Sequence, residues 1–196
     1  MQILKQESNQ TSEFNIESAN RERRIIFLTG EINTDMAQNV AEQLAYFNYE
    51  DQHEPIKLFI NSNGGAVMAG LLIYDLIQGS RAPIELYCLE KAFSMAAIIF
   101  CSGRHGRYLL PHSQIMVHDL RLSESIGGGN TSSIRELSQE MVRLKSDMDE
   151  IISQHTGQPL SQVAQVTKTD SFFKAEEAVK FGFADGVKTF AEMLAI

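Results

Sequence analysis

The sequence predicts an α/β fold built around a mostly parallel sheet. Short apolar runs of the kind that form buried strands alternate with segments whose apolar residues recur at helical spacing. Two of the strand-to-helix junctions carry small residues, at Gly64-Gly65 and around Ser94. Strands separated by helices run parallel, so their carboxyl ends meet at one edge of the sheet, where ligands bind. We therefore expect these two junctions to be neighbours in space.

The elements of the first half follow from apolar runs and from the residues that end them. Residues 1–20 are polar with few apolar positions, which predicts a flexible arm or loop. Continuous apolar runs predict strands, and helical spacing with polar caps at Asn33 or Thr34 predicts helices. The expected order is strand 24–28, helix 34–49, strand 56–60, helix 67–77, strand 84–89 and helix 95–102.

The second half adds two short strands and a long helix. Strands are expected at 107–110 and 114–118. The apolar residues of 131–155 step by three and four, which predicts a helix of about 36 Å with a narrow apolar stripe. Such a helix is longer than one small core needs, so it packs across its own domain or against another subunit. Shorter helices at 160–166 and 175–181 and a last strand at 184–190 complete the chain.

Composition narrows the class of protein. The chain has 196 residues, which suits one domain, and a net charge of −8, which argues against nucleic acid or an anionic membrane as partner. Its two cysteines, Cys88 and Cys101, lie in apolar runs and form no CxxC motif. The polar N-terminus lacks the apolar core of a secretory signal, and no apolar run reaches membrane-span length. We expect a cytoplasmic protein with reduced thiols, no metal site and no cofactor.

Ser94 is the candidate nucleophile, because a serine at a strand-to-helix turn lies beside free backbone N–H groups that can hold an oxyanion. Tight packing would also explain its small neighbours. Among the histidines, His118 alone ends an apolar strand and can act as the base. Asp119 and Asp170 are both candidate acids, but Asp170 precedes two phenylalanines that would bury it. Burial of an unpaired carboxylate costs free energy, and pairing of Asp170 with His118 would offset that cost. Lys91 could form a Ser–Lys dyad instead.

Motifs along most of the chain resemble one known family. Over about residues 17–190 the sequence is similar to the proteolytic subunit of the Clp protease (ClpP). The matching motifs, in chain order, are Ile26-Phe27-Leu28-Thr29-Gly30-Glu31-Ile32, Phe59-Ile60-Asn61-Ser62-Asn63-Gly64-Gly65, Ala69-Gly70, Ile73-Tyr74-Asp75, Ser94-Met95, Leu110-Pro111-His112-Ser113, Met116-Val117-His118, His155-Thr156-Gly157-Gln158, Ala175-Glu176-Glu177-Ala178-Val179 and Phe181-Gly182.

The resemblance implies a ClpP/crotonase-like spiral with a protruding handle at about 120–156. It implies a serine endopeptidase with Ser94 as nucleophile, His118 as base and Asp170 as orienter, and with the backbone N–H groups of Gly65 and Met95 as the oxyanion hole. Residues 1–17 match a flexible axial loop, and 18–196 match a single peptidase domain. Segment 126–129 matches the handle strand, and helix 131–156 matches the contact between two stacked seven-membered rings. The family degrades unfolded polypeptides fed by an AAA+ ATPase and uses no metal or cofactor itself.

The family also implies a docking pocket for the ATPase, at positions matching Phe59, Tyr87, Tyr108 and Leu110. Several residues depart from the family pattern near this pocket and near the nucleophile: Lys57, Asn63, Gly79, Glu90, Phe93 and the Asp119-Leu120 pair after His118. These departures favour the hypothesis that the chain is a divergent paralogue, which forms a mixed assembly with a second ClpP-type subunit. A structural or regulatory ring subunit with little activity is the alternative, and an acyl-CoA enzyme of the crotonase type is a weaker one.

Overall fold

Strands and helices alternate along the chain in the computed structural model, which describes residues 2–7, 10–121 and 131–194. The strands are β1 (Gln2–Glu7), β2 (Gln10–Asn15), β3 (Ile25–Ile32), β4 (Ile56–Gly65), β5 (Ile84–Phe93), β6 (Arg107–Leu109), β7 (Gln114–Val117), β8 (Ser171–Lys174) and β9 (Gly186–Val187). The helices are α1 (Ile16–Glu22), α2 (Thr34–Glu50), α3 (Val67–Gly79), α4 (Met95–Cys101), α5 (Thr131–Thr156), α6 (Leu160–Val166), α7 (Ala175–Phe181) and α8 (Phe190–Leu194).

The central sheet is mostly parallel, as predicted. Its strands follow the order β3-β4-β5-β6-β9, and β7 and β8 extend it from β5. The long strand β5 has two partners in turn, because Leu86–Cys88 pairs with β6 and Lys91–Phe93 pairs with β7. Only the pairing of β7 with β8 is antiparallel within this described sheet. This arrangement confirms the α/β class.

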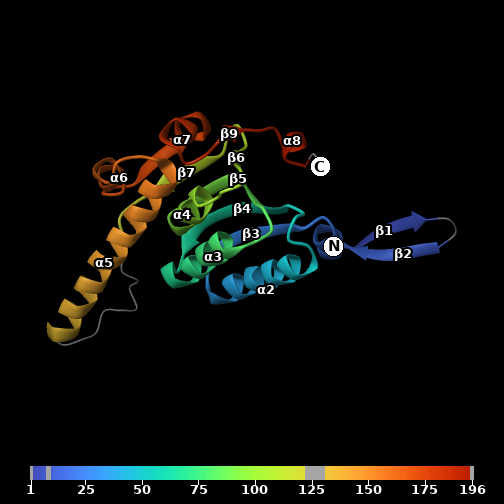
Figure 1. Cartoon of the computed structure of the whole chain (residues 1–196), viewed down its shortest axis with the longest axis horizontal. Helices are drawn as coiled ribbons and strands as arrows, with labels where there is room; N and C mark the ends of the chain where they lie inside the picture. Colours follow the sequence, from blue (N-terminus) through green and yellow to red (C-terminus); the bar gives the residue numbers. More distant parts are fainter. Residues whose placement is uncertain (1, 8–9, 122–130, 195–196) are drawn as a thin grey trace.

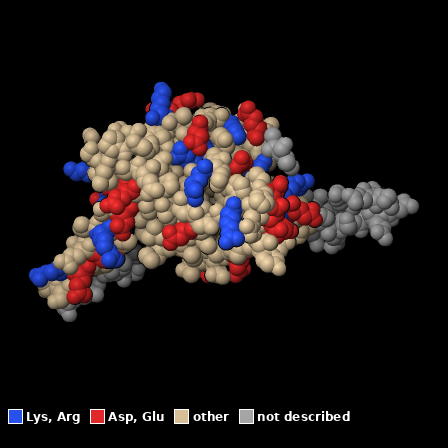
Figure 2. Space-filling view, viewed as in Figure 1, with Lys and Arg blue, Asp and Glu red and all other residues tan. Residues whose placement is uncertain are grey.

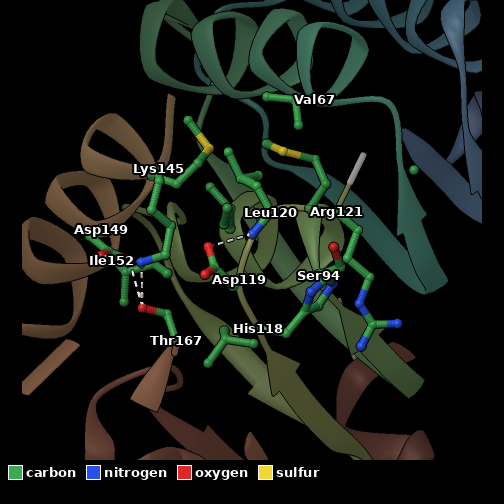
Figure 3. A pocket seen from close by; sticks show the side chains of 15 residues that line it. Val67, Ser94, His118, Asp119, Leu120, Arg121, Lys145, Asp149, Ile152 and Thr167 are labelled. Carbon is green, nitrogen blue, oxygen red and sulfur yellow. Dashed lines mark hydrogen bonds and ion pairs between the residues drawn. The ribbon is translucent and has the colours of Figure 1, made fainter. Parts of the chain in front are cut away.

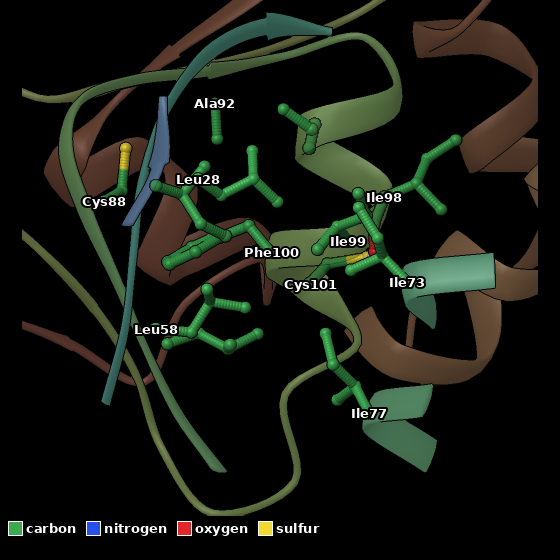
Figure 4. Packing of buried hydrophobic residues seen from close by; sticks show 14 of the residues in the cluster. Leu28, Leu58, Ile73, Ile77, Cys88, Ala92, Ile98, Ile99, Phe100 and Cys101 are labelled. Carbon is green, nitrogen blue, oxygen red and sulfur yellow. The ribbon is translucent and has the colours of Figure 1, made fainter. Parts of the chain in front are cut away.

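Helices α2 and α3 lie side by side along one part of the sheet, and α4 packs into the core beside them (Figure 1). Every residue of α4 is buried. Its Ile99 and Phe100 pack among apolar side chains of β3, β4 and α3 (Figure 4). Burial also raises the pKa of the Cys88 and Cys101 thiols to about 12, so both stay protonated near neutral pH. The core thus fixes the turn from which α4 begins.

The long helix α5 extends away from the body of the molecule (Figure 1), with bounds close to those predicted. Its buried residues, Met148, Asp149 and Ile152, lie in its C-terminal half. The apolar side chains of Ile134 and Val142 are 62% and 69% exposed. The N-terminal half of α5 therefore carries apolar surface that its own domain does not cover. The predicted handle strand at 126–129 lies outside the described residues.

Both ends of the chain differ from the sequence prediction. The backbone of residues 2–7 and 10–15 pairs as an antiparallel hairpin within the segment predicted to be an arm or loop. A hairpin depends on backbone pairing, which composition does not reveal. The predicted strand 184–190 is only the two-residue β9, followed by α8. The N–H of Thr189 donates to Glu192 (2.7 Å), and the Glu192 N–H donates to the Thr189 hydroxyl (3.4 Å). This capping box starts α8, and the spacing Thr-x-x-Glu was its sequence signal.

Acidic and basic side chains are interspersed over the face of the molecule shown in Figure 2, without one continuous basic area. Within the described ranges, no helix is both long and apolar enough to cross a membrane. The same part of the chain holds no group of three or more His, Cys, Asp or Glu side chains placed to bind a metal ion.

Candidate active site

Ser94 lies at the turn between β5 and α4, where its backbone adopts an unusual conformation. Its φ is 55° and its ψ is −126°, and among the described non-glycine residues only Arg24 shares a positive φ. The Ser94 N–H donates to the carbonyl oxygen of Met116 on β7 (2.7 Å). Such backbone strain persists only where surrounding structure holds it, often at functional sites. The turn holds Ser94 at the N-terminus of α4, which is the geometry of a nucleophile elbow.

The Gly64-Gly65 turn lies against Ser94, which confirms the predicted neighbourhood of the two junctions. A Cβ atom on Gly64 would lie 2.8 Å from the Cβ atom of Ser94 and 3.0 Å from the backbone nitrogen of Met95. The hydroxyl of Ser62 donates to the Gly30 carbonyl (2.5 Å) and accepts from the Gly64 N–H (3.0 Å). These contacts hold the Gly64-Gly65 turn in place. A side chain at Gly64 would clash with Ser94, so only glycine allows the turn to lie this close to the serine.

A cavity of about 240 Å³ opens beside the two turns. Ser94 and His118 lie together at one end of it, and Lys145, Asp149 and Thr167 lie at the other (Figure 3). Apolar side chains form much of the wall between them. The full lining is Gly65, Val67, Ser94, Met95, Ile98, Val117, His118, Asp119, Leu120, Arg121, Lys145, Met148, Asp149, Ile152 and Thr167. The space can therefore receive an apolar side chain next to the serine.

His118 follows β7 and reaches this cavity because of the strand register. Met116 pairs with Phe93 on the parallel strand β5, so Ser94 and His118 leave adjacent strands at the same edge of the sheet. The Nδ1 atom of His118 is buried and has no hydrogen-bond partner among the residues that the structure describes. That atom is the one that an acid must contact to orient the imidazole toward a serine.

Asp170 is exposed, so the prediction that the following phenylalanines bury it is wrong. Phe172 on β8 is itself 56% exposed and cannot cover the carboxylate. Both carboxylate oxygens accept hydrogen bonds from Nη2 of Arg121, at 2.6 and 2.8 Å. Within the described part of the chain, no hydrogen bond joins Ser94, His118 and Asp170 to one another. The structure places Ser94 and His118 at one cavity, and it pairs Asp170 with Arg121 instead of with His118.

A polar network at the far end of the cavity was not foreseen. Lys145 forms an ion pair with the buried Asp149 one helical turn later on α5. Both side chains also contact Thr167: Lys145 Nζ donates to the Thr167 hydroxyl (2.8 Å), and that hydroxyl donates to Asp149 Oδ1 (2.8 Å). Thr167 directly follows α6 as its C-cap, three residues before Asp170. The four-residue spacing of Lys145 and Asp149 was the sequence signal for the pair.

Of the departures near the nucleophile, Asp119 and Leu120 line the cavity, whereas Glu90 and Phe93 do not. Glu90 is exposed and accepts a hydrogen bond from Asn61 Nδ2 (3.1 Å). This bond, together with Lys91, lowers the pKa of the Glu90 carboxyl. The ring of Phe93 packs edge-on against Phe172 (centroids 5.7 Å apart). The side chains of Glu90 and Phe93 therefore contact β4 and β8 rather than fill the cavity.

The four predicted docking residues lie together, with Phe59, Tyr87 and Tyr108 on neighbouring strands and Leu110 directly after β6, and none of them lines the cavity. Phe59 stacks on Tyr87 (centroids 4.9 Å apart), and Tyr87 lies 5.6 Å from Tyr108. Leu110 packs against the same cluster. Phe59 and Tyr87 are only 1% and 2% exposed. The four side chains thus form one cluster, in which Phe59 and Tyr87 are buried and Tyr108 and Leu110 are partly buried.

The family model for Clp protease matches residues 8–190. This match covers most of the chain, so the chain belongs to the Clp protease family and is a ClpP-type peptidase with the ClpP/crotonase fold. Membership sets aside the acyl-CoA enzyme as an alternative.

Proposed function

We propose that this chain is the serine endopeptidase subunit of a cytoplasmic, self-compartmentalising protease. The observation that carries the proposal is the strained Ser94 turn, which shares a cavity with His118 and abuts the Gly64-Gly65 turn. Ser94 is the nucleophile, and His118 is the general base and acid. Asp170 orients His118, and the N–H groups of Gly65 and Met95 form the oxyanion hole.

Each of these residues then has a defined role in peptide-bond hydrolysis. His118 takes the proton of the Ser94 hydroxyl as the oxygen attacks the scissile carbonyl carbon, and the oxyanion accepts hydrogen bonds from the two backbone N–H groups. His118 gives the proton to the leaving amine, and water hydrolyses the acyl-enzyme by the same route. The apolar part of the cavity wall binds the substrate side chain next to the bond that is cut.

The proposed assembly is two stacked seven-membered rings joined through residues 131–156. The exposed apolar side chains of Ile134 and Val142 support a partner surface on this helix. An AAA+ unfoldase supplies unfolded polypeptide, and a second ClpP-type subunit completes the assembly if the rings are mixed.

Covalent labelling tests the proposed nucleophile. A fluorophosphonate probe should modify the assembled particle at Ser94, because the activated hydroxyl attacks the phosphorus atom. Mass mapping of the labelled peptide identifies the residue, and a Ser94→Ala particle serves as the control. An assembled particle that stays unlabelled at Ser94, both alone and with an ATPase bound, would contradict the proposal.

Removing Arg121 should raise peptidase activity. Arg121→Ala frees the Asp170 carboxylate to approach His118 Nδ1, and exposed ion pairs of this kind are worth only about 0–1 kcal/mol. We expect kcat/KM for a short fluorogenic peptide to rise by up to about fivefold. Arg143→Ala, which removes another exposed arginine ion pair, should have no effect. A fall in activity on Arg121→Ala would instead mean that Arg121 holds Asp170 in its working position.

A structural or regulatory ring subunit is the second candidate. It is favoured by the contact of Asp170 with Arg121, which leaves His118 Nδ1 unpartnered in the described chain. In a mixed particle, this candidate predicts that Ser94→Ala changes nothing.

A further inference from the structure

The cavity beside Ser94 has an apolar wall and a polar far end. Ser94 and His118 lie at one end, and Lys145, Asp149 and Thr167 lie at the other (Figure 3). Apolar side chains line much of the cavity between them: Val67, Ile98, Val117, Met148 and Ile152. A long substrate side chain that enters beside the serine can therefore pack on apolar surface and present its tip to hydrogen-bonding groups.

The charges at the polar end cancel, because Lys145 and Asp149 form an ion pair there. This end still has capacity for further hydrogen bonds. The ammonium group of Lys145 has three N–H bonds, and within the described part of the chain Asp149 and Thr167 accept two of them. The Asp149 carboxylate offers about four acceptor sites, of which Lys145 and Thr167 occupy two. One donor and further acceptor sites therefore remain for a ligand.

An uncharged primary amide matches this combination. Its carbonyl oxygen can accept from the remaining N–H of Lys145, while its NH2 group donates to Asp149. A carboxylate would face Asp149 and also Asp119, which lines the same cavity, and a second cation would face Lys145. Such like charges repel each other strongly where water is excluded. Among amide side chains, glutamine is the one with two methylene groups that can pack on the apolar wall.

We propose that Lys145 and Asp149 make this cavity a subsite for glutamine, so that the chain cuts polypeptides after glutamine in preference to methionine or glutamate. The inference rests on the proposed function, because it names the substrate class of the Ser94 site. A methionine side chain has the same length, but it would exclude water from Lys145 and Asp149 without replacing the lost hydrogen bonds. A site that hydrogen-bonds its substrate therefore rejects an analogue that lacks the polar group.

Peptide hydrolysis by the assembled particle tests the inference. The probes are fluorogenic peptides that differ only in the residue before the scissile bond, which is glutamine, methionine or glutamate. We expect kcat/KM for the glutamine peptide to exceed each of the others at least about tenfold. In a Lys145→Met/Asp149→Leu chain, the preference should reverse in favour of methionine, because apolar groups of similar volume replace both charges together. Thr167 keeps an acceptor in this variant, the carbonyl oxygen of Val163 (2.9 Å).

Two further variants sharpen the test. Arg143→Met is the matched control, because it removes a positive charge from an exposed position of the same helix outside the cavity. It should keep the preference for glutamine. Asp149→Asn preserves the shape of the side chain and leaves the charge of Lys145 uncancelled. We expect it to raise kcat/KM for the glutamate peptide relative to the glutamine peptide at least about threefold.

A binding measurement separates this inference from the proposed function. A Ser94→Ala particle is titrated into fluorescent peptides of glycine and serine that carry one glutamine, methionine or glutamate, and anisotropy reports binding. The glutamine peptide should bind at least about tenfold more tightly than the others. This binding order needs no catalysis, so a particle that hydrolyses no peptide would contradict the proposed function while binding still decided the subsite.

Three results would overturn the glutamine subsite. The first is equal kcat/KM for the glutamine and methionine peptides. The second is a preference for glutamine that survives in the Lys145→Met/Asp149→Leu chain. The third, in the Ser94→Ala particle, is equal affinity for the three peptides or no binding up to millimolar concentration. None of these results concerns labelling of Ser94 by a fluorophosphonate, so the proposed peptidase activity would stand.

Discussion

Replacing Ser94 with alanine is expected to abolish peptidase activity while leaving the particle assembled. The substitution removes the only group in the proposed mechanism that forms a bond with the substrate. Loss of a serine nucleophile from such a triad lowers kcat by about 10⁴–10⁶-fold. The catalysis that remains comes from the oxyanion hole and from substrate binding. The measurement is hydrolysis of an unstructured fluorogenic peptide, with sedimentation to confirm the assembly.

Ser102→Ala is the matched control for this prediction. Ser102 lies at the other end of α4, and its buried hydroxyl donates to the carbonyl of Ile99 (2.6 Å). Its removal deletes a hydroxyl from the same helix without touching the cavity. Activity that persists in an assembled Ser94→Ala particle, homomeric or mixed, would favour the structural subunit over the peptidase.

Replacing Gly65 with alanine should damage both the oxyanion hole and the sheet. Gly65 has a φ of 152° and pairs with Ile32 on β3, and an added Cβ atom would overlap the Ile32 carbonyl oxygen. The backbone has to shift, which moves the Gly65 N–H away from the oxyanion. Loss of one oxyanion donor lowers kcat by about 10²–10³-fold. We therefore expect a fall of at least about 10²-fold in kcat together with a lower Tm.

Gly186→Ala separates this effect from a general intolerance of larger residues in strands. A Cβ atom at Gly186 would meet nothing closer than the Tyr108 ring at 3.9 Å, an ordinary van der Waals distance. This variant should keep its peptidase activity and its Tm. If Gly65→Ala also kept full kcat, then the Gly65 N–H would not hold the oxyanion.

Elements with a strong local signal were predicted almost to the residue. Helices α6 and α7 have the predicted bounds, and α7 ends at Gly182, whose φ is 98°. Asn33 caps α2 through its side chain (2.9 Å to the Met36 N–H). These features depend on apolar spacing and on capping residues, both of which are local in sequence. By contrast, β8 was missed, because four residues that pair antiparallel to β7 carry too short a pattern to separate from a loop.

The candidate site was likewise predicted only in part from the sequence. The sequence by itself determined that Ser94 and Gly64-Gly65 lie at the ends of neighbouring parallel strands, because a strand–helix repeat leaves little choice of direction. It also determined the class of fold and the long helix. Only the tertiary structure decided that Asp170 pairs with Arg121 and that Thr167 contacts Lys145. Partners so far apart in sequence are set by where the folded backbone places each side chain, and no local pattern encodes that.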